Sequence, residues 1–136
     1  MLAAALLVVV LIAVLVAGVF FATMEESRIA DSAESRDRAL IAAESAIAGA
    51  IEGWSDRSGQ PIGVNGAELS TISDGQFSVE LTITRLDSAF YSLVARSTSS
   101  ERAAMRRIGV VTSLQKSVDG SIHVAPISER WWSDLF

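Results

Sequence analysis

The only histidine in the chain, His123, is the first residue to consider for chemistry, because imidazole is the commonest general base in enzymes. Serines are abundant, so the side-chain types of a Ser-His-Asp triad are present. No nucleophile-elbow motif accompanies them. A single histidine in a predicted strand is more often structural. We therefore expect no catalytic residue, and the sequence does not predict an enzyme.

Metal and cofactor sites are also not predicted. The chain has no cysteine, so a metal ion would depend on carboxylates. Glu25 and Glu26 are adjacent on a predicted helix and point apart, and no calcium-loop spacing appears. Gly59, Gly63 and Gly66 do not form a phosphate loop, since no Gly-Lys-Ser/Thr follows them.

The distribution of charge excludes nucleic acid as a partner. The net charge is −5, and residues 23–54 hold seven acids and three arginines, which gives −4 for that stretch. An acidic stretch repels a phosphate backbone, and no basic patch is present elsewhere.

The N-terminal run 1–22 carries no charged side chain. As a helix it would be about 33 Å long, which matches a bilayer core of about 30 Å. It is longer than a signal-peptide core, and no Lys or Arg precedes it. We predict a membrane-anchor helix. Within it, small residues lie four apart in the pairs Ala13/Ala17 and Gly18/Ala22. These pairs either favour close packing between helices or reflect the high alanine content of membrane helices in general. Its residues include Met1, Leu2, Leu6, Leu7, Val10, Ala13, Val14, Ala17, Gly18, Phe20 and Phe21.

Residues 23–54 are polar but keep apolar residues at steps of three, four and seven, which predicts an amphipathic continuation of the same helix through Trp54. Five of these apolar residues are expected to pack on a sheet: Leu40, Ala43, Ile47, Ile51 and Trp54. Three arginines, Arg28, Arg36 and Arg38, are candidates for contacts with acids of neighbouring helices.

The order of these features resembles type IV pilins, and most closely the N-terminus of PilX-type pilins. The resemblance covers residues 1 to about 54: the charge-free run, the stretch 24–28, then Arg36-Asp37-Arg38-Ala39 and the stretch 42–46. The chain has Ala5 where most major pilins carry a glutamate, and it lacks their proline near position 22.

The resemblance implies a structural subunit of a type IV pilus-like filament. Such subunits are held in the inner membrane by the apolar half of the helix, which then packs in the core of an extracellular filament on the cell surface. The implied partners are further copies in a helical homopolymer, related pilins, a prepilin peptidase and the pilus assembly machinery. Met1 would be a mature N-terminus.

The C-terminal part is expected to be a small antiparallel sheet, so that the predicted fold class is α+β. Residues 55–75 are rich in Gly, Ser and Asp and are predicted to form a connecting loop. Alternation and short turns predict a meander of strands at 76–86, 89–97, 103–115 and 121–127, with Asp119-Gly120 as a hairpin turn. The domain 76–136 ends in an aromatic tail.

Large apolar residues at a chain terminus are unusual, because termini are commonly frayed. Trp131, Trp132 and Phe136 either fold back on their own domain or dock on a neighbouring subunit, since aromatic residues are favoured interface anchors.

Two other functions remain open on sequence alone. The chain is alternatively a single-pass, membrane-anchored exported binding domain that does not polymerise, or a type II secretion pseudopilin. The anchored domain explains the apolar run but not the long helical continuation, since a short flexible linker would serve as well.

Overall fold

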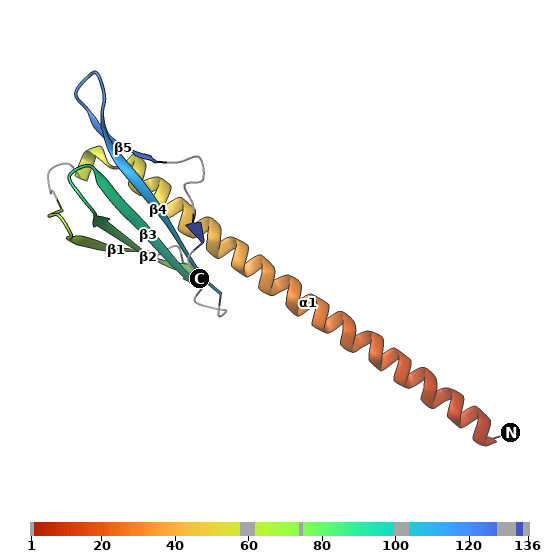
Figure 1. Ribbon diagram of the computed structural model, residues 1–136. Helices are drawn as coiled ribbons and strands as arrows, with labels where there is room; N and C mark the ends of the chain where they lie inside the picture. Colours follow the sequence, from red (N-terminus) through yellow and green to blue (C-terminus); the bar gives the residue numbers. More distant parts are fainter. Residues whose placement is uncertain (1, 58–61, 74, 100–103, 128–132, 135–136) are drawn as a thin grey trace. The chain divides into compact units, whose positions relative to one another are not determined.

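The computed structural model describes residues 2–57, 62–73, 75–99, 104–127 and 133–134. It has an α+β fold, with a long N-terminal helix and an antiparallel sheet (Figure 1). The chain divides into two compact units, Met1–Glu34 and Ser35–Phe136.

Helix α1 runs from Leu2 to Glu52 without a break. No proline lies within it, since both prolines of the chain come later, and its only glycines are Gly18 and Gly49. The helix ends where the Gly53 amide donates to the Gly49 carbonyl at 3.0 Å. A short 3₁₀ turn, η1 (Ser55–Arg57), follows. Trp54 therefore lies in the turn just beyond the helix, two residues past its last helical residue.

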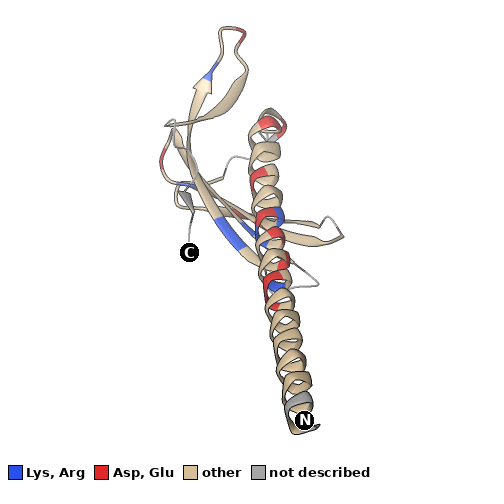
Figure 2. Cartoon of the chain, turned by 90° about the vertical axis from the view of Figure 1, so that its right-hand side faces the viewer, with Lys and Arg blue, Asp and Glu red and all other residues tan. Residues whose placement is uncertain are grey.

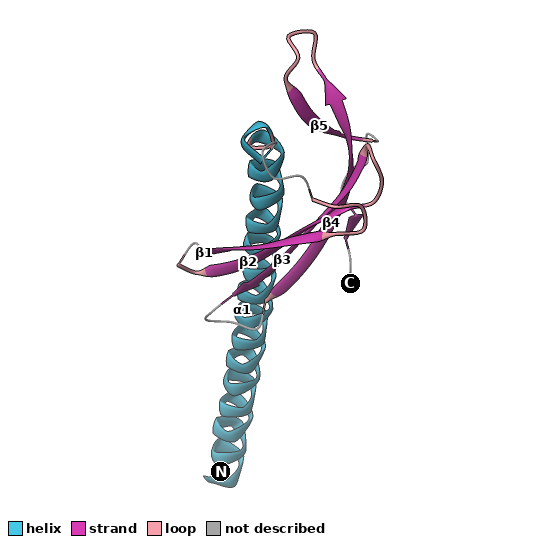
Figure 3. Ribbon diagram, turned by 90° about the vertical axis from the view of Figure 1, so that its left-hand side faces the viewer, coloured by secondary structure: helices cyan, strands magenta, loops and turns pink. Residues whose placement is uncertain are grey.

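The second unit contains the sheet and the last turns of α1. Its strands are β1 (Ala67–Ser73), β2 (Phe77–Arg85), β3 (Phe90–Ser99), β4 (Met105–Lys116), β5 (Ile122–Pro126) and β6 (Ser133–Asp134). The first five lie side by side in sequence order, each antiparallel to the next, and β6 pairs with β4 beside β5 (Figure 3). The predicted four-strand meander is confirmed within two residues at each described strand end.

The prediction of a loop throughout 55–75 is wrong, because β1 occupies residues 67–73. This strand pairs along its whole length with β2, from Ala67 opposite Thr84 to Ser73 opposite Ser78. Nearly all of its side chains are exposed. An exposed edge strand does not need the alternation of apolar and polar residues that marks a half-buried strand, so no periodic pattern predicts a strand here.

The core of the second unit lies between α1 and one face of the sheet. From α1 it takes four alanines and an isoleucine at helical spacing, followed by Trp54. From β2 to β4 it takes the residues of alternating positions, and β5 adds Val124. The buried members are Ala39, Ala43, Ala46, Ile47, Ala50, Trp54, Val79, Leu81, Ile83, Tyr91, Leu93, Ala95, Ile108, Val110 and Val124. Alanines on the helix bring its backbone close to the sheet, so that the larger strand side chains fill the interface.

Candidate functional site

The apolar segment of α1 is exposed along its length in the first unit. Leu6 is 62 % exposed and Phe21 is 74 % exposed. The other described side chains predicted for this segment are also exposed: Leu7, Val10, Ala13, Val14, Ala17, Gly18 and Phe20. Met1 and the side chain of Leu2 lie outside the described residues. Exposed apolar surface of this extent marks a site of contact with lipid or with another protein.

By length and composition, α1 is able to cross a membrane. Its charged residues begin only after the apolar stretch, as Figure 2 shows. At that boundary the Thr23 hydroxyl donates to the carbonyl oxygens of Val19 and Phe20, both at 3.0 Å. The hydroxyl is therefore satisfied within its own helix, as a polar group must be where water is absent. The helix is compatible with membrane anchoring.

The three arginines named from the sequence lie in different surroundings. Arg28 approaches Glu25 one turn earlier, with 3.9 Å between guanidinium nitrogen and carboxylate oxygen. Both side chains are exposed, so this ion pair contributes little to stability. Arg36 is exposed, and Arg38 is exposed at the border of a groove between α1 and the β1–β2 hairpin.

The five residues predicted to pack on the sheet all lie at the interface between α1 and the strands. Ala43, Ile47 and Trp54 are buried, and Leu40 and Ile51 are partly buried against the same cluster. The indole ring of Trp54 contacts the ring of Tyr91 on β3 edge to face, with 4.8 Å between the ring centroids. These residues fix the last turns of the helix on the sheet.

Arg85 connects three segments and is not among the residues predicted from the sequence. Its guanidinium donates to the carbonyl oxygens of Ile62 at 2.9 Å, Asp87 at 3.1 Å and Ser88 at 3.3 Å. It also lies 5.8 Å from the centroid of the Tyr91 ring. A planar guanidinium with five donors is suited to bind several carbonyl oxygens at once. These contacts depend on the geometry of the loops, which no sequence pattern predicts.

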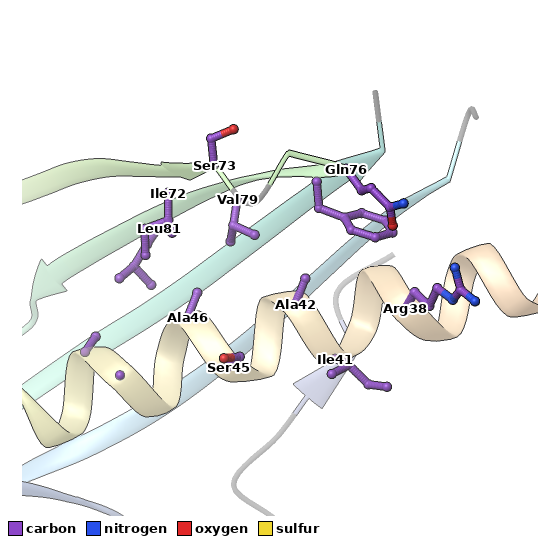
Figure 4. Close-up of a pocket in the computed structure, with 13 residues that line it drawn as sticks. Arg38, Ile41, Ala42, Ser45, Ala46, Ile72, Ser73, Gln76, Val79 and Leu81 are labelled. Carbon is purple, nitrogen blue, oxygen red and sulfur yellow. The ribbon is translucent and has the colours of Figure 1, made fainter. Parts of the chain in front are cut away.

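A groove with a volume of about 820 Å³ opens between α1 and the β1–β2 hairpin of the second unit (Figure 4). Ala42 and Ala46 point from the helix toward Ile72 of β1 and Val79 of β2. The groove exists because the helix presents small side chains here, while β1 lies at the edge of the sheet where the helix does not cover it. Of the described residues that line it, Arg38 is the charged one.

The hairpin between β4 and β5 carries His123, and its turn is built by hydrogen bonds. The Asp119 carboxylate accepts from the Ser121 amide at 3.0 Å and from the Ser121 hydroxyl at 2.7 Å. These two bonds, the side-chain one first, lower the pKa of Asp119 below its ordinary value. Gly120 supplies the positive φ of 89° that the turn requires.

His123 lies exposed beside this turn, with its Nδ1 3.1 Å from the Ser117 hydroxyl oxygen. Asp119 is bonded to Ser121 rather than to the imidazole. A triad requires a carboxylate that orients the histidine and donors that stabilise an oxyanion. Among the described residues of this hairpin, Asp119 stabilises the turn and does not orient the imidazole.

Among the described residues, no group of three or more histidine, aspartate and glutamate side chains is placed to hold a metal ion. The aromatic residues Trp131, Trp132 and Phe136 lie outside the described residues, so the two alternatives for the tail stay predictions.

Comparison with protein-family models, with curated proteins and with solved structures found no match for this chain.

Proposed function

We propose that this chain is a structural subunit of a type IV pilus-like filament, which assembles through bundling of its N-terminal helices. One observation carries the proposal: α1 continues unbroken from Leu2 to Glu52, exposed and apolar at one end and buried against an antiparallel sheet at the other. The resemblance of residues 1–54 to pilin N-termini supports it independently.

The exposed apolar side chains supply the mechanism. In the inner membrane, lipid covers residues such as Leu11 and Phe20, which removes their apolar surface from water. Passage from lipid into a helix bundle gains no further hydrophobic free energy, because lipid tails are as apolar as leucine. The gain must come from close packing, which small residues allow. Ala13, Ala17 and Gly18 are exposed, and a Cβ added at Gly18 would meet no atom within 4 Å.

The proposal is tested by electron microscopy of material sheared from the cell surface, with the chain identified by mass spectrometry in the same fraction. Filaments in which the chain predominates are expected for a major subunit. Filaments that hold it only in traces would make it a minor or tip subunit. A chain that stays wholly in the membrane fraction, without filaments, would overturn the proposal.

A double variant separates packing from anchoring. Ala13→Leu with Ala17→Leu keeps the segment apolar, so membrane retention is expected to be unchanged, but the larger side chains obstruct close helix approach and filaments are expected to be lost. The matched control is Val8→Leu with Val19→Leu, on the opposite side of the helix at 100° per residue. It adds less volume and is expected to leave filaments in place.

A second candidate is a membrane-anchored exported domain that binds a ligand without polymerising. The groove beside β1 favours it, because its volume of about 820 Å³ is within the range of ligand sites. A type II secretion pseudopilin differs from a pilus subunit in the filament that it joins. Both alternatives place the chain at the same membrane, and the shearing experiment separates the anchored domain from the assembled subunit.

A further inference from the structure

Strand β1 forms one outer edge of the sheet, and among the described strands none pairs with its outer side (Figures 1 and 3). The direction of its backbone groups follows from a hydrogen bond at its start. The Arg85 amide donates to the Gly66 carbonyl at 3.0 Å, and the bonding direction alternates from residue to residue along an antiparallel pair. Residues 68, 70 and 72 therefore bond to β2. The amide and carbonyl groups of the alternate residues point outward: Ala67, Leu69, Thr71 and Ser73.

Strand β5, the other outer strand of the five-strand order, is protected against pairing with a further strand. The Ile127 amide donates to the Val111 carbonyl of β4 at 3.3 Å, so by the same alternation the backbone of position 126 points outward. That position is Pro126, which has no amide hydrogen to donate. Proteins commonly use proline or a charged side chain to prevent such pairing at a sheet edge. The outward positions of β1 carry neither, so this edge is open to another strand.

The strand that fits this edge best is β1 of a second copy. Strand β5 is shorter, with five residues against the seven of β1, and it lacks the donor at position 126. When two β1 strands run antiparallel with Ser70 opposite Ser70, all of their residues overlap. Leu69 of each copy then lies opposite Thr71 of the other, and Ala67 lies opposite Ser73. All of these residues point outward, so each outward amide faces a carbonyl of the second copy.

The side chains of β1 also suit this register. Glu68 of each copy lies opposite Ile72 of the other, so the two carboxylates are about 13 Å apart along the strands. That distance exceeds the Debye length of about 8 Å at physiological ionic strength, so their repulsion is largely screened. Leu69 is 61 % exposed, and the two Leu69 side chains become diagonal neighbours on one face of the joined sheet. Each then covers apolar surface of the other.

We propose that β1 pairs antiparallel with β1 of a second copy, centred on Ser70, so that the sheets of the two copies become continuous. The contact is isologous, because the same strand contributes on both sides, and it closes after two copies. It therefore goes beyond the proposed function, since a closed pair does not by itself propagate a filament.

A single cysteine tests this contact directly, because the sequence contains none. In the proposed register the two Ser70 residues form a non-hydrogen-bonded pair, whose Cα atoms are about 4.5 Å apart. That distance is within the range of disulfide bridges. Ser70→Cys in the full-length chain, purified in detergent and mildly oxidised, is expected to give a disulfide-linked dimer on a non-reducing gel. Absence of this dimer would overturn the contact.

The matched control is Ser73→Cys. Ser73 is more exposed than Ser70, so chance collisions between copies favour a bridge at position 73. In the proposed register, however, the two Ser73 residues lie at opposite ends of the paired strands, about 20 Å apart. Ser73→Cys is therefore expected to stay monomeric. Equal yields of dimer from the two variants would indicate chance collision or parallel pairing and would overturn the antiparallel register.

Proline at position 71 tests whether the backbone makes the contact. Thr71→Pro removes an outward amide and keeps the bonds to β2, so the fold is expected to persist. Near-ultraviolet circular dichroism of the Trp54–Tyr91 pair verifies the fold. In the Ser70→Cys background Thr71→Pro is expected to abolish the dimer, whereas Thr71→Ala keeps the amide and should leave it in place. A dimer that survives Thr71→Pro in a folded chain would contradict strand pairing.

Failure of this contact is distinguishable from failure of the proposed function, because the cross-link is measured on the purified chain. Filaments recovered from cells, together with a Ser70→Cys chain that stays monomeric, would overturn the strand pairing and leave the filament function standing. A dimer bridged at position 70, from cells that produce no filaments, would support the pairing and overturn the filament function.

Discussion

The indole ring of Trp54 contacts the phenol ring of Tyr91 at 73° between the ring planes, with the centroids 4.8 Å apart. Trp54 follows the last turn of α1, and Tyr91 lies near the start of β3, so the pair joins the end of the helix to the middle of the sheet. Both residues are buried. Edge-to-face aromatic pairs add about 0.5–1.5 kcal/mol to the free energy gained by burying their surface. The pair is therefore a strong attachment point between helix and sheet.

Removal of this ring is expected to destabilise the second unit. Trp54→Ala should lower the free energy of unfolding by about 3–5 kcal/mol, because it leaves a cavity and removes the aromatic contact. Trp54→Phe should cost less, since a smaller ring still fills part of the site. The measurement is the urea midpoint of the full-length chain in detergent, followed by near-ultraviolet circular dichroism. Val64→Ala, at an exposed position, is the control and is expected to change the free energy by no more than about 0.5 kcal/mol.

The guanidinium of Arg85 is expected to hold the segment 62–66 against the β2–β3 turn. Arg85→Lys keeps the charge but loses the fork of donors to the carbonyls of Ile62, Asp87 and Ser88. We expect the free energy of local opening to fall by about 1–3 kcal/mol. Faster amide exchange at Asn65, which donates to the Arg85 carbonyl, would show this change. Arg107→Lys, at an exposed position of β4, should leave exchange at Asn65 unaltered.

The turn that carries Asp119 is expected to be insensitive to pH until strongly acidic conditions. Hydrogen bonds from Ser121 lower the pKa of Asp119, so the folded turn favours the ionised carboxylate. The ionised carboxylate therefore stabilises the folded turn. This stabilisation is complete at pH values above the pKa of Asp119 in the unfolded chain, and it is lost as the pH falls through the lower pKa of Asp119 in the folded chain. An NMR titration of the Asp119 carboxyl should therefore show its midpoint below the usual range of aspartate.

Ser121→Ala checks the cause of that shift. It removes the side-chain hydrogen bond but keeps the backbone one, so the pKa of Asp119 should move back toward its ordinary value. An unchanged midpoint in this variant would contradict the assigned cause. Ser113→Ala, on β4 away from the turn, serves as the control and should leave the midpoint in place.

A charge placed in the apolar segment of α1 is expected to release the chain from the membrane. Val14→Asp puts a carboxylate in the middle of the segment, which costs about 2.5–3.5 kcal/mol on insertion scales. The fraction of chain that resists alkaline extraction from membranes should fall accordingly. Ala33→Asp introduces the same side chain at an exposed position of the polar stretch and should have no effect. If both variants extracted like the unaltered chain, residues 1–22 would not be the anchor.

The parts of the fold that the sequence predicted are those where burial imposes a period. Val79, Leu81 and Ile83 alternate because one face of β2 is buried, and Leu40, Ala43 and Ile47 recur at helical spacing because one face of α1 is covered. Strand β1 has no such constraint. Its two large apolar residues, Leu69 and Ile72, are three residues apart and therefore lie on opposite faces of the sheet. The strand thus shows no alternation of apolar and polar residues.

The groove could not be predicted for the same reason. It forms where β1 extends past the cover of the helix, so its existence depends on a strand that the sequence did not reveal. The role of Arg85 was also missed, because its three acceptors are backbone carbonyls, which every residue carries. The hairpin turn was predicted, because a tight hairpin turn requires a positive φ and the pair Asp119-Gly120 is one of the few that readily adopts it.

The strand order has a consequence for how the sheet forms. Each of the first five strands pairs with its neighbour in sequence, from β1 beside β2 to β4 beside β5. Short loops close at low entropic cost, and folds rich in local pairings form quickly. The meander is therefore suited to form one hairpin at a time, each as soon as its second strand is available. Among the described strands, only β6 departs from this order, since it pairs with β4 rather than with β5.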